Sequence, residues 1–289
     1  DLLDDPRFLP MQTAPPGGLL RFIDKTQPSD LNLHTNTNSK SKSKSMRSSP
    51  QEIATTLFVL KYIPEDIDTT SVGLSVLYKF GTVGMDTINV VLDKVLAEHV
   101  CDVDSILQTY FDVERPRIDP VVITNALFLF HLAGRGHEVL RSQTFVEDLL
   151  LHKGYEGGTL YYGFAEAFLF HVARLVNAFP DWFARTRMRD LLVKRLMEHE
   201  ITFIKVTAQS EPPSNNCLAL AMYLRARLLS GLHNATTYEH QLVGFQKENG
   251  SWGPHPYNHF GVDRKIWVGN EGLSTAFALS ALTKHSVRS

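Results

Sequence analysis

The sequence predicts an all-α protein, and three observations lead to that fold class. Apolar residues recur three and four positions apart in almost every stretch from residue 51 onward, which is the period of a helix. Start and stop signals flank these stretches, as where Pro120 opens an apolar run that ends at Gly134. Convincing strands, with alternating apolar and polar residues, are absent from the pattern. We therefore expect roughly ten helices joined by short loops.

The expected helices follow one another along the chain. The first three share regular apolar periodicity, the next two are bounded by glycine or proline, and the remainder alternate with short polar connections. In order they cover residues 54–63, 70–80, 85–98, 121–134, 161–179, 182–204, 215–232, 237–246 and 270–285.

Several of these helices are apolar over much of their circumference, which is typical of helices packed on two sides. Inner and outer helices alternating around a ring would produce this pattern and would leave a central apolar cavity. The chain carries 17 Phe, 9 Tyr and 3 Trp, many of them in the segments 128–130, 161–164 and 168–170, so such a cavity would be lined with aromatic rings.

Composition narrows the class of function. The net charge is −2, with basic and acidic residues nearly balanced, so the chain lacks the electrostatic footprint of a nucleic-acid binder. The two cysteines, Cys101 and Cys217, form no CxxC motif, which favours a reducing compartment. No apolar run reaches membrane-spanning length, and the first ten residues lack the features of a secretory signal. We expect a cytoplasmic protein without a membrane span.

The chain divides into two parts. Residues 1–50 show little periodicity and contain the Ser/Lys/Asn-rich stretch 35–50, which cannot bury apolar surface and is expected to form a mobile loop. Residues 51–289 are expected to form the helical domain.

The stretch PEDIDTTS, residues 64–71, places Asp66 and Asp68 two positions apart with Thr69 and Thr70 directly behind them. One interpretation is a helix N-cap, which would explain Asp68 or Thr69 without any chemistry but leaves Asp66 unexplained. A second is the nucleophile motif of a phosphatase of the haloacid-dehalogenase type. That motif ends a buried parallel strand, whereas Lys61 and Pro64 interrupt the preceding residues here.

The third interpretation is protonation of a carbon–carbon double bond. An alkene is a very weak base, so the acid must stay un-ionised at neutral pH. Burial and a neighbouring carboxylate both raise the pKa of a carboxyl group. Two aspartates followed by hydroxyls meet these requirements on the acid. The cation that forms then needs a dry, aromatic-lined pocket.

Beyond this chemistry, DIDTTS resembles the Asp-x-Asp-Thr-Thr acid motif of class II terpene cyclases of the drimane-type sesquiterpene group, which are related to fusions with a haloacid-dehalogenase-like domain. The segments 109–122 (TYFDVERPRIDPVV) and 133–138 (AGRGHE) are similar to further elements of that family. The segment 242–253 (LVGFQKENGSWG) resembles a QW element, carried by Gln246 and Trp252, and 268–282 resembles the family's closing helix. Together these matches extend over residues 51–284.

The resemblance implies a double-layered α/α barrel, the β domain of squalene-cyclase-like enzymes. It implies that Asp68 is the general acid, that Asp66 tunes it, and that Thr69 and Thr70 position the acid. The implied substrate is a linear prenyl diphosphate, with farnesyl diphosphate expected, and the implied product is a bicyclic drimane-type diphosphate of drimenyl or albicanyl type. A phosphatase domain, or a separate phosphatase, would be the expected partner.

Basic residues are candidates for binding the diphosphate. Arg115 and Arg117 flank a proline and would present planar donors to phosphate oxygens, and Arg264 and Lys265 come next. The alternative is that Arg117 pairs with Asp112 or Asp119 as a clasp within the loop.

Mg²⁺ commonly accompanies diphosphates and is the expected cofactor; its protein ligands are unknown, although Asp4 and Asp5 are candidates.

The expected pocket residues are mostly aromatic: Phe128, Tyr161, Tyr162, Glu166, Phe168 and Trp267. His131 and His171, each following FLF, are either hydrogen-bonded core residues or proton acceptors at the end of the reaction. Two other functions stay open at this point. One is a protein prenyltransferase-like subunit, whose zinc site would have to use the cluster 101–104. The other is a non-catalytic helical ring that binds a lipid or a protein.

Overall fold

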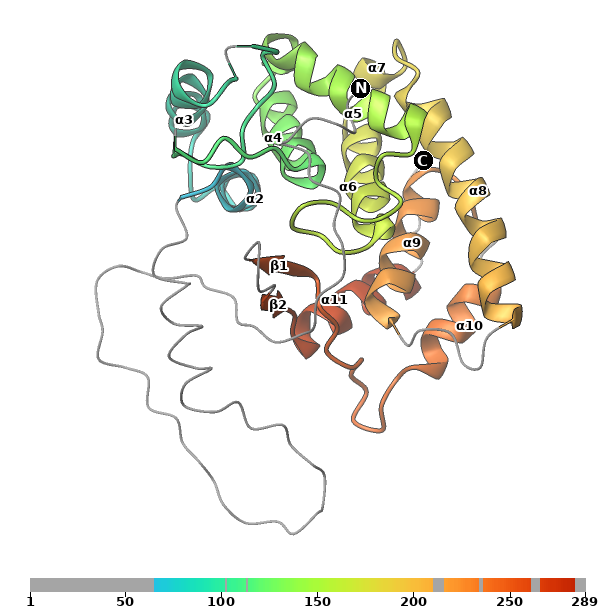
Figure 1. Ribbon diagram of the computed structural model, residues 1–289. Coiled ribbons are helices and arrows are strands. Elements are labelled where there is room, and N and C mark those ends of the chain that lie inside the picture. The colour runs from blue at the N-terminus through green and yellow to red at the C-terminus, as the bar shows by residue number, and fades with distance from the viewer. Residues whose placement is uncertain are drawn as a thin grey trace, which may run out of the picture.

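A computed structural model of the chain describes residues 65–101, 103–112, 114–209, 216–233, 236–260 and 266–283. Most of these residues are helical, which confirms the predicted fold class (Figure 1). The segments 1–50 and 54–63, and with them the expected mobile loop and first helix, lie outside the described residues.

The helices follow the chain with short connections. The first half contains α2 (Ile67–Lys79), α3 (Met85–Glu98), α4 (Pro120–Leu132), the 3₁₀ helix η1 (Gly136–Val139), α5 (Leu140–His152) and α6 (Ala165–Ala178). The second half contains α7 (Pro180–Phe183), α8 (Met188–Gln209), α9 (Cys217–Leu229), α10 (Thr236–Gly244) and α11 (Glu271–Leu282). The sequence analysis assigned no helix to residues 140–152, where α5 lies.

The helices form an inner and an outer row. In chain order α2, α4, α6, α9 and α11 each pack against the next, and Figure 1 shows them following a curve. The helices α3, α5, α8 and α10 pack against members of this row, with α8 lying outside α6 and α9. This arrangement matches the alternation of inner and outer helices expected from the sequence. The closed barrel and its central cavity stay predictions.

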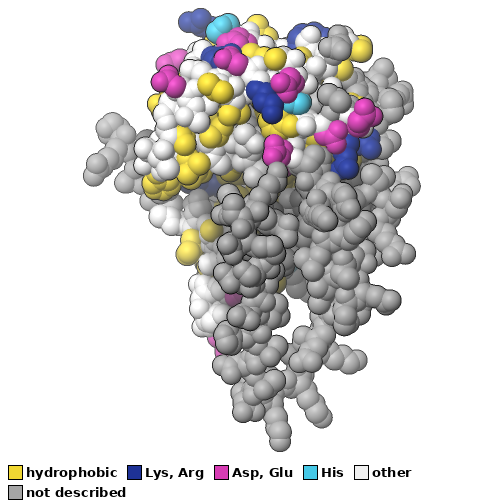
Figure 2. Space-filling view, turned by 90° about the vertical axis from the view of Figure 1, so that its left-hand side faces the viewer, with side chains coloured by type: hydrophobic (Ala, Val, Ile, Leu, Met, Phe, Trp, Pro, Cys, Tyr) yellow, Lys and Arg dark blue, Asp and Glu magenta, His cyan; other side chains and the backbone are white. Residues whose placement is uncertain are grey.

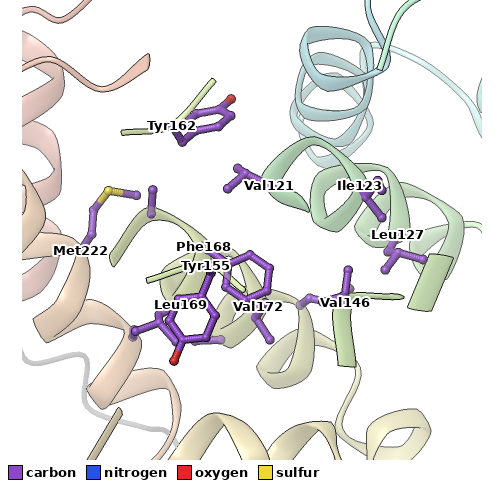
Figure 3. Close-up of a cluster of buried hydrophobic side chains, with 14 of the residues drawn as sticks. Val121, Ile123, Leu127, Val146, Tyr155, Tyr162, Phe168, Leu169, Val172 and Met222 are labelled. Carbon is purple, nitrogen blue, oxygen red and sulfur yellow. The ribbon is translucent and has the colours of Figure 1, made fainter. Parts of the chain in front are cut away.

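The inner helices α4 and α9 bury side chains around nearly their whole circumference, as their apolar sequences predict. Figure 3 shows part of the resulting core, a single cluster to which Val121 and Leu127 of α4 and Phe168 and Val172 of α6 belong. Helices α4 and α9 are thus held by hydrophobic burial on more than one side.

Helix α2 is packed differently. Its buried positions are Ile67, Ser71 and Ser75, and the Ser75 hydroxyl donates to the Ser71 carbonyl oxygen at 2.7 Å. Small side chains on this face allow the close contact between α2 and α4. Apolar residues such as Val76 and Phe80 face outward instead. Figure 2, which views the side of the molecule where α2 and α3 lie, shows hydrophobic side chains exposed among charged ones.

The connection between α3 and α4 runs beside the start of α2. The Ile67 N–H donates to the Thr109 carbonyl at 2.9 Å, and the Phe111 N–H donates to the Glu65 carbonyl at 2.9 Å. These bonds fix where α2 begins relative to α4.

One feature differs from the expected pattern. Residues Asn258–Phe260 (β1) and Ile266–Val268 (β2) form a two-stranded antiparallel sheet, with His259 opposite Trp267. Three-residue strands are too short to show an alternating pattern in the sequence. The sheet is joined to the loop before α6, because the His259 N–H donates to the Tyr161 carbonyl at 2.8 Å.

The QW element has a structural role. The Trp252 side chain is buried, and its indole N–H donates to the Leu242 carbonyl oxygen in the last turn of α10 at 2.7 Å. The Gln246 amide donates to the Gly250 carbonyl at 2.9 Å and closes the loop. The element therefore fixes the end of α10.

Candidate active site

Asp68 lies in the first turn of α2, and its side chain receives two hydrogen bonds from other elements. The Asn125 amide of α4 donates to Asp68 Oδ1 at 2.7 Å. The Tyr162 hydroxyl, from the loop before α6, donates to Asp68 Oδ2. Both oxygens of one carboxyl group are thus held by side chains 57 and 94 positions away in sequence.

A hydrogen-bonded network orients the Asn125 amide. Asn125 Oδ1 accepts from the Arg174 guanidinium at 3.1 Å, and His171 Nδ1 lies 2.8 Å from the same oxygen. A guanidinium can only donate, so the amide oxygen must face Arg174 and the amide nitrogen must face Asp68. His171 Nδ1 therefore carries the proton that it donates to Asn125.

The other ring nitrogen of His171 completes the network. Burial, followed by the nearby Arg174 charge, lowers the pKa of His171 well below its ordinary value, so the ring is neutral. With the proton on Nδ1, Nε2 accepts from the Tyr257 hydroxyl at 2.7 Å. Along Tyr257, His171 and Asn125, every donor points toward Asp68.

This environment raises the pKa of Asp68 above its ordinary value. Burial is the largest cause. The hydrogen bonds from Tyr162 and Asn125 and the Arg174 charge all lower the pKa, but they do not outweigh burial. Asp68 is therefore a carboxyl group that keeps its proton to higher pH than an exposed aspartate.

Asp66 has a different role. It is the N-cap of α2: its Oδ1 accepts from the Thr69 N–H at 2.6 Å, and its Oδ2 accepts from the Thr69 hydroxyl at 3.2 Å. The capping interpretation of PEDIDTTS thus applies to Asp66, whereas the sequence analysis assigned it to Asp68 or Thr69. Burial, with a contribution from the Asp68 charge, raises the pKa of Asp66 to about 6, against the Thr69 bonds.

The hydroxyls expected to position the acid do not contact Asp68. Thr69 bonds to Asp66, and the backbone N–H of Thr70 donates to the Asp66 carbonyl at 3.4 Å. Among the described residues, the groups that hold Asp68 are Asn125 and Tyr162.

The expected pocket residues lie in different surroundings. The Arg174 guanidinium lies over the Phe128 ring, 4.1 Å from the centre of that ring. Phe128 thus contacts a member of the Asp68 network. The Tyr161 ring meets Tyr110 edge-on at 5.9 Å. Trp267 packs so closely on Gly163 that a Cβ there would lie 2.5 Å from the indole ring, which explains the glycine.

Two other expected pocket residues have partners in the packed interior. Phe168 is completely buried and stacks on Tyr155 with 5.0 Å between ring centres. Glu166 is buried and accepts from His199 of α8 at 2.8 Å. His131 packs among Phe179, Trp182 and Phe183.

The expected diphosphate ligands are only partly described. Arg115 is exposed and pairs with Asp112 at 3.2 Å, so the loop clasp uses Arg115 and not the Arg117 that the sequence suggested. Arg117 is half-buried, with its charge close to the Tyr161 hydroxyl. Arg264 and Lys265 lie outside the described residues, as do Asp4 and Asp5.

Sequence reasoning missed Asn125, Arg174 and Tyr257 as parts of the site. A usable signal existed for the first two, since each is a polar residue in a predominantly apolar helix. Such residues are costly to bury without partners, so they mark where a polar network lies. Tyr257 lies in a polar connection, where nothing distinguishes it.

The described residues contain no group of three or more His, Cys, Asp or Glu side chains that could hold a metal ion. Within the same residues, no helix combines the length and apolarity needed to cross a membrane.

Comparison with known proteins shows which sequences this chain is similar to. Residues 26–133, which include Asp66, Asp68 and Asn125, match the family model described as the sesquiterpene cyclase astC-like C-terminal domain. The chain is also 35% identical over 225 residues to the drimenol cyclase drtB of Aspergillus calidoustus.

The alignment with drimenol cyclase drtB covers 78% of this chain and 39% of that relative. The chain thus spans about two-fifths of the length of the curated protein that it matches. These similarities confirm the resemblance found in the sequence: the chain is similar to drimane-type sesquiterpene cyclases.

Proposed function

We propose that the chain is a class II sesquiterpene cyclase, in which Asp68 protonates the terminal double bond of a linear prenyl diphosphate. The observation that carries this proposal is the state of Asp68: a carboxyl group with a raised pKa, whose two oxygens are both held by donors from other elements. The similarity to a drimenol cyclase supports the same reaction class.

The proposed reaction is an isomerisation. The O–H bond of Asp68 breaks and a C–H bond forms at the terminal alkene, which leaves a tertiary cation. The remaining double bonds attack in turn, forming two carbon–carbon bonds of a decalin. Loss of a proton from the last cation gives the neutral ring system, and the diphosphate stays attached throughout.

The residues around Asp68 suit this chemistry. A proton donor to an alkene must be strongly acidic when the substrate is bound, and yet un-ionised beforehand. Burial raises the pKa of Asp68 and so favours its protonated form, and the donors from Asn125 and Tyr162 stabilise the carboxylate that remains after proton transfer.

Aromatic rings beside the network would stabilise the carbocation. Tyr257 lies edge-on to Tyr162 at 5.0 Å, and Phe277 of α11 lies 5.1 Å from Phe170 and 6.2 Å from Tyr257. Tyr257, Phe170 and Phe277 are each partly exposed, so ring surface is available to a ligand. The π faces of such rings attract positive charge.

The diphosphate would lie against basic residues away from Asp68. Arg117, whose charge lies close to the Tyr161 hydroxyl, is one proposed ligand, and Arg115, Arg264 and Lys265 complete the proposed set. We propose farnesyl diphosphate as substrate and a drimenyl- or albicanyl-type diphosphate as product. Conversion to an alcohol would require a phosphatase domain or partner, and the proposed location is the cytoplasm.

Mg²⁺ is proposed to accompany the diphosphate, bound through phosphate oxygens, one or two carboxylates and retained waters.

The proposal is tested by incubating the purified protein with farnesyl and geranylgeranyl diphosphates. The products are treated with phosphatase and identified by mass spectrometry. We expect a bicyclic C15 alcohol from wild type and only acyclic farnesol from Asp68→Asn. Equal cyclisation by both proteins would contradict the assigned role of Asp68.

A further inference from the structure

Asp119 lies where the two elements that hold Asp68 meet. It is completely buried at the start of α4, and both of its carboxylate oxygens are occupied by donors. We propose that Asp119 is a positioning residue, whose carboxylate sets the two hydrogen bonds that Asp68 receives. This inference rests on the proposed function, because it assigns Asp119 a part in the protonation step.

One oxygen of Asp119 fixes α4. Asp119 Oδ1 accepts from the Val121 and Val122 N–H groups at 2.8 and 3.2 Å, which makes it the N-cap of the helix. Asn125 lies on the next turn of the same helix, and its amide donates to Asp68 Oδ1. The cap therefore fixes the end of α4 from which this donor extends.

The other oxygen fixes the loop before α6. Asp119 Oδ2 accepts from the Tyr161 N–H at 2.8 Å, and the Thr159 hydroxyl also bonds to the Asp119 carboxylate. The next residue, Tyr162, donates to Asp68 Oδ2. One carboxylate thus joins both elements that hold the acid.

The loop is tightly closed on itself at this point. The Thr159 N–H donates to the Tyr162 carbonyl at 2.7 Å, and the Tyr162 N–H donates to the Thr159 hydroxyl at 3.3 Å. Gly158 has φ +84°, and a Cβ there would lie 2.7 Å from the Tyr162 carbonyl oxygen. A displacement of Thr159 or Tyr161 would therefore move Tyr162 with them.

Asp119→Asn separates the two functions of the carboxylate. Asparagine has one side-chain oxygen, which can still cap α4, while its amide nitrogen cannot accept from the Tyr161 N–H. Thr159→Val is a second variant, which weakens the loop side alone and leaves the cap of α4 intact. Asn216→Ala is the matched control, because it removes the N-cap of α9, where Asn216 accepts from the Ala219 N–H at 3.0 Å.

The pH dependence of cyclisation distinguishes positioning from simple loss of stability. Cyclisation requires protonated Asp68, so the rate falls as pH rises through the pKa of that group. The Tyr162 bond lowers this pKa, so displacing Tyr162 should move the fall in rate to higher pH. The other titratable or charged groups near Asp68 are Asp66, Asp119, His171, Arg174 and Tyr257. Removing the Asp119 charge acts the opposite way, so an upward shift reports the lost Tyr162 bond.

We expect Asp119→Asn and Thr159→Val to reduce kcat, by up to about 10²-fold, with little change in KM. We expect the alkaline limb of the pH–rate profile to move to higher pH in both variants, as it should in Tyr162→Phe. Adding Asp119→Asn to Tyr162→Phe should move the limb no further upward, because the Tyr162 bond is already lost and removal of the Asp119 charge acts in the opposite direction. An unmoved limb in both single variants, or an equal shift in Asn216→Ala, would overturn the inference.

Amide hydrogen exchange provides a readout that does not depend on turnover. Exchange at the Tyr161 N–H should quicken in Asp119→Asn while α4 stays protected. Unchanged exchange at Tyr161 would overturn the inference that Asp119 holds the loop. Absence of any cyclised product from the wild type would instead overturn the proposed function, so the two failures are distinct.

Discussion

Asp66 and Asp68 are chemically identical and two residues apart, yet they serve different purposes. Asp66 is the N-cap residue before α2 and has an extended backbone, whereas Asp68 lies in the first helical turn, so the two side chains leave the chain in different directions. Asp66 turns back to cap the helix, whereas Asp68 turns toward α4 and the Tyr162 loop. Spacing alone predicted that both would matter, but the assignment needed the partners, which come from distant parts of the sequence.

The first prediction concerns Asp68→Asn. Asparagine keeps the shape of the side chain but has no acidic proton, so cyclisation should fall by at least the 10²–10⁴-fold typical of a lost general acid. Binding of the prenyl diphosphate, measured by calorimetry with an unreactive analogue, should be unchanged, because the proposed basic ligands lie elsewhere. Near-normal turnover would show that Asp68 is not the donor.

The second prediction compares Asp66→Asn with Asp66→Ala. Asparagine is also a good N-cap, so its free energy of unfolding should stay close to wild type, whereas alanine should lose about 1 kcal/mol. Chemical denaturation of both variants measures the difference. Equal stability of the two variants would argue that the observed cap contributes nothing. Cyclisation abolished in Asp66→Asn but retained in Asp68→Asn would mean that the catalytic roles are reversed.

At the level of single elements, the sequence predicted most helices but not the purpose of their polar residues. The period of apolar residues predicts α3, α4, α6 and α9 directly, because burial of an apolar face determines them. It also predicted the helix over 70–80 that corresponds to α2, but not its buried face, which carries Ser71 and Ser75, and it missed α5 and the short β1–β2 pair. Asn125 and Arg174 were visible as exceptions in apolar helices, yet their common partner could not be inferred without the fold.

The QW element provides a prediction at this scale. Trp252→Phe removes the indole N–H bond to the end of α10 and part of a buried ring, so the free energy of unfolding should fall by about 1–3 kcal/mol. Cyclisation by the folded variant at low temperature should be close to wild type, because the hydrogen bonds of Trp252 in the described residues go to Thr275 and Leu242 and not to the Asp68 network. A large loss of kcat with unchanged stability would contradict a purely structural role.

The buried cap of α4 makes stability depend on pH. Burial raises the pKa of Asp119 to about 6, above the ordinary 3.8, against the bonds from Thr159, Tyr161 and Val122. Between these values the folded state binds more protons than the unfolded state. The contribution of Asp119 is therefore fully present below the lower value, and it is lost as pH rises through about 6.

The fourth prediction follows from this sign. Between pH 4 and pH 7, the Asp119 carboxyl should make the free energy of unfolding of the wild type fall by about 2–3 kcal/mol. Asp119→Asn should lack this fall. Urea titrations at several pH values measure both slopes. Parallel slopes in the two proteins would show that Asp119 has an ordinary pKa.

At the scale of the whole molecule, two rows of helices bring residues from four distant segments to one acid. Helices α2, α4 and α6 contribute Asp68, Asn125 and His171, while the loops before α6 and β1 contribute Tyr162 and Tyr257. Periodicity predicted the helices and their double layer. It could not predict which side chains converge, because that depends on the order in which the inner helices pack.

The proposed mechanism requires that ring closure begin with a proton delivered by Asp68, which exchanges with solvent between turnovers. Incubation of farnesyl diphosphate with the protein in D₂O tests this most directly. We predict a bicyclic product that carries one deuterium at the carbon of the former terminal double bond, with the diphosphate retained, and no such product from Asp68→Asn. A cyclic product without deuterium, formed with loss of diphosphate, would contradict protonation as the first step.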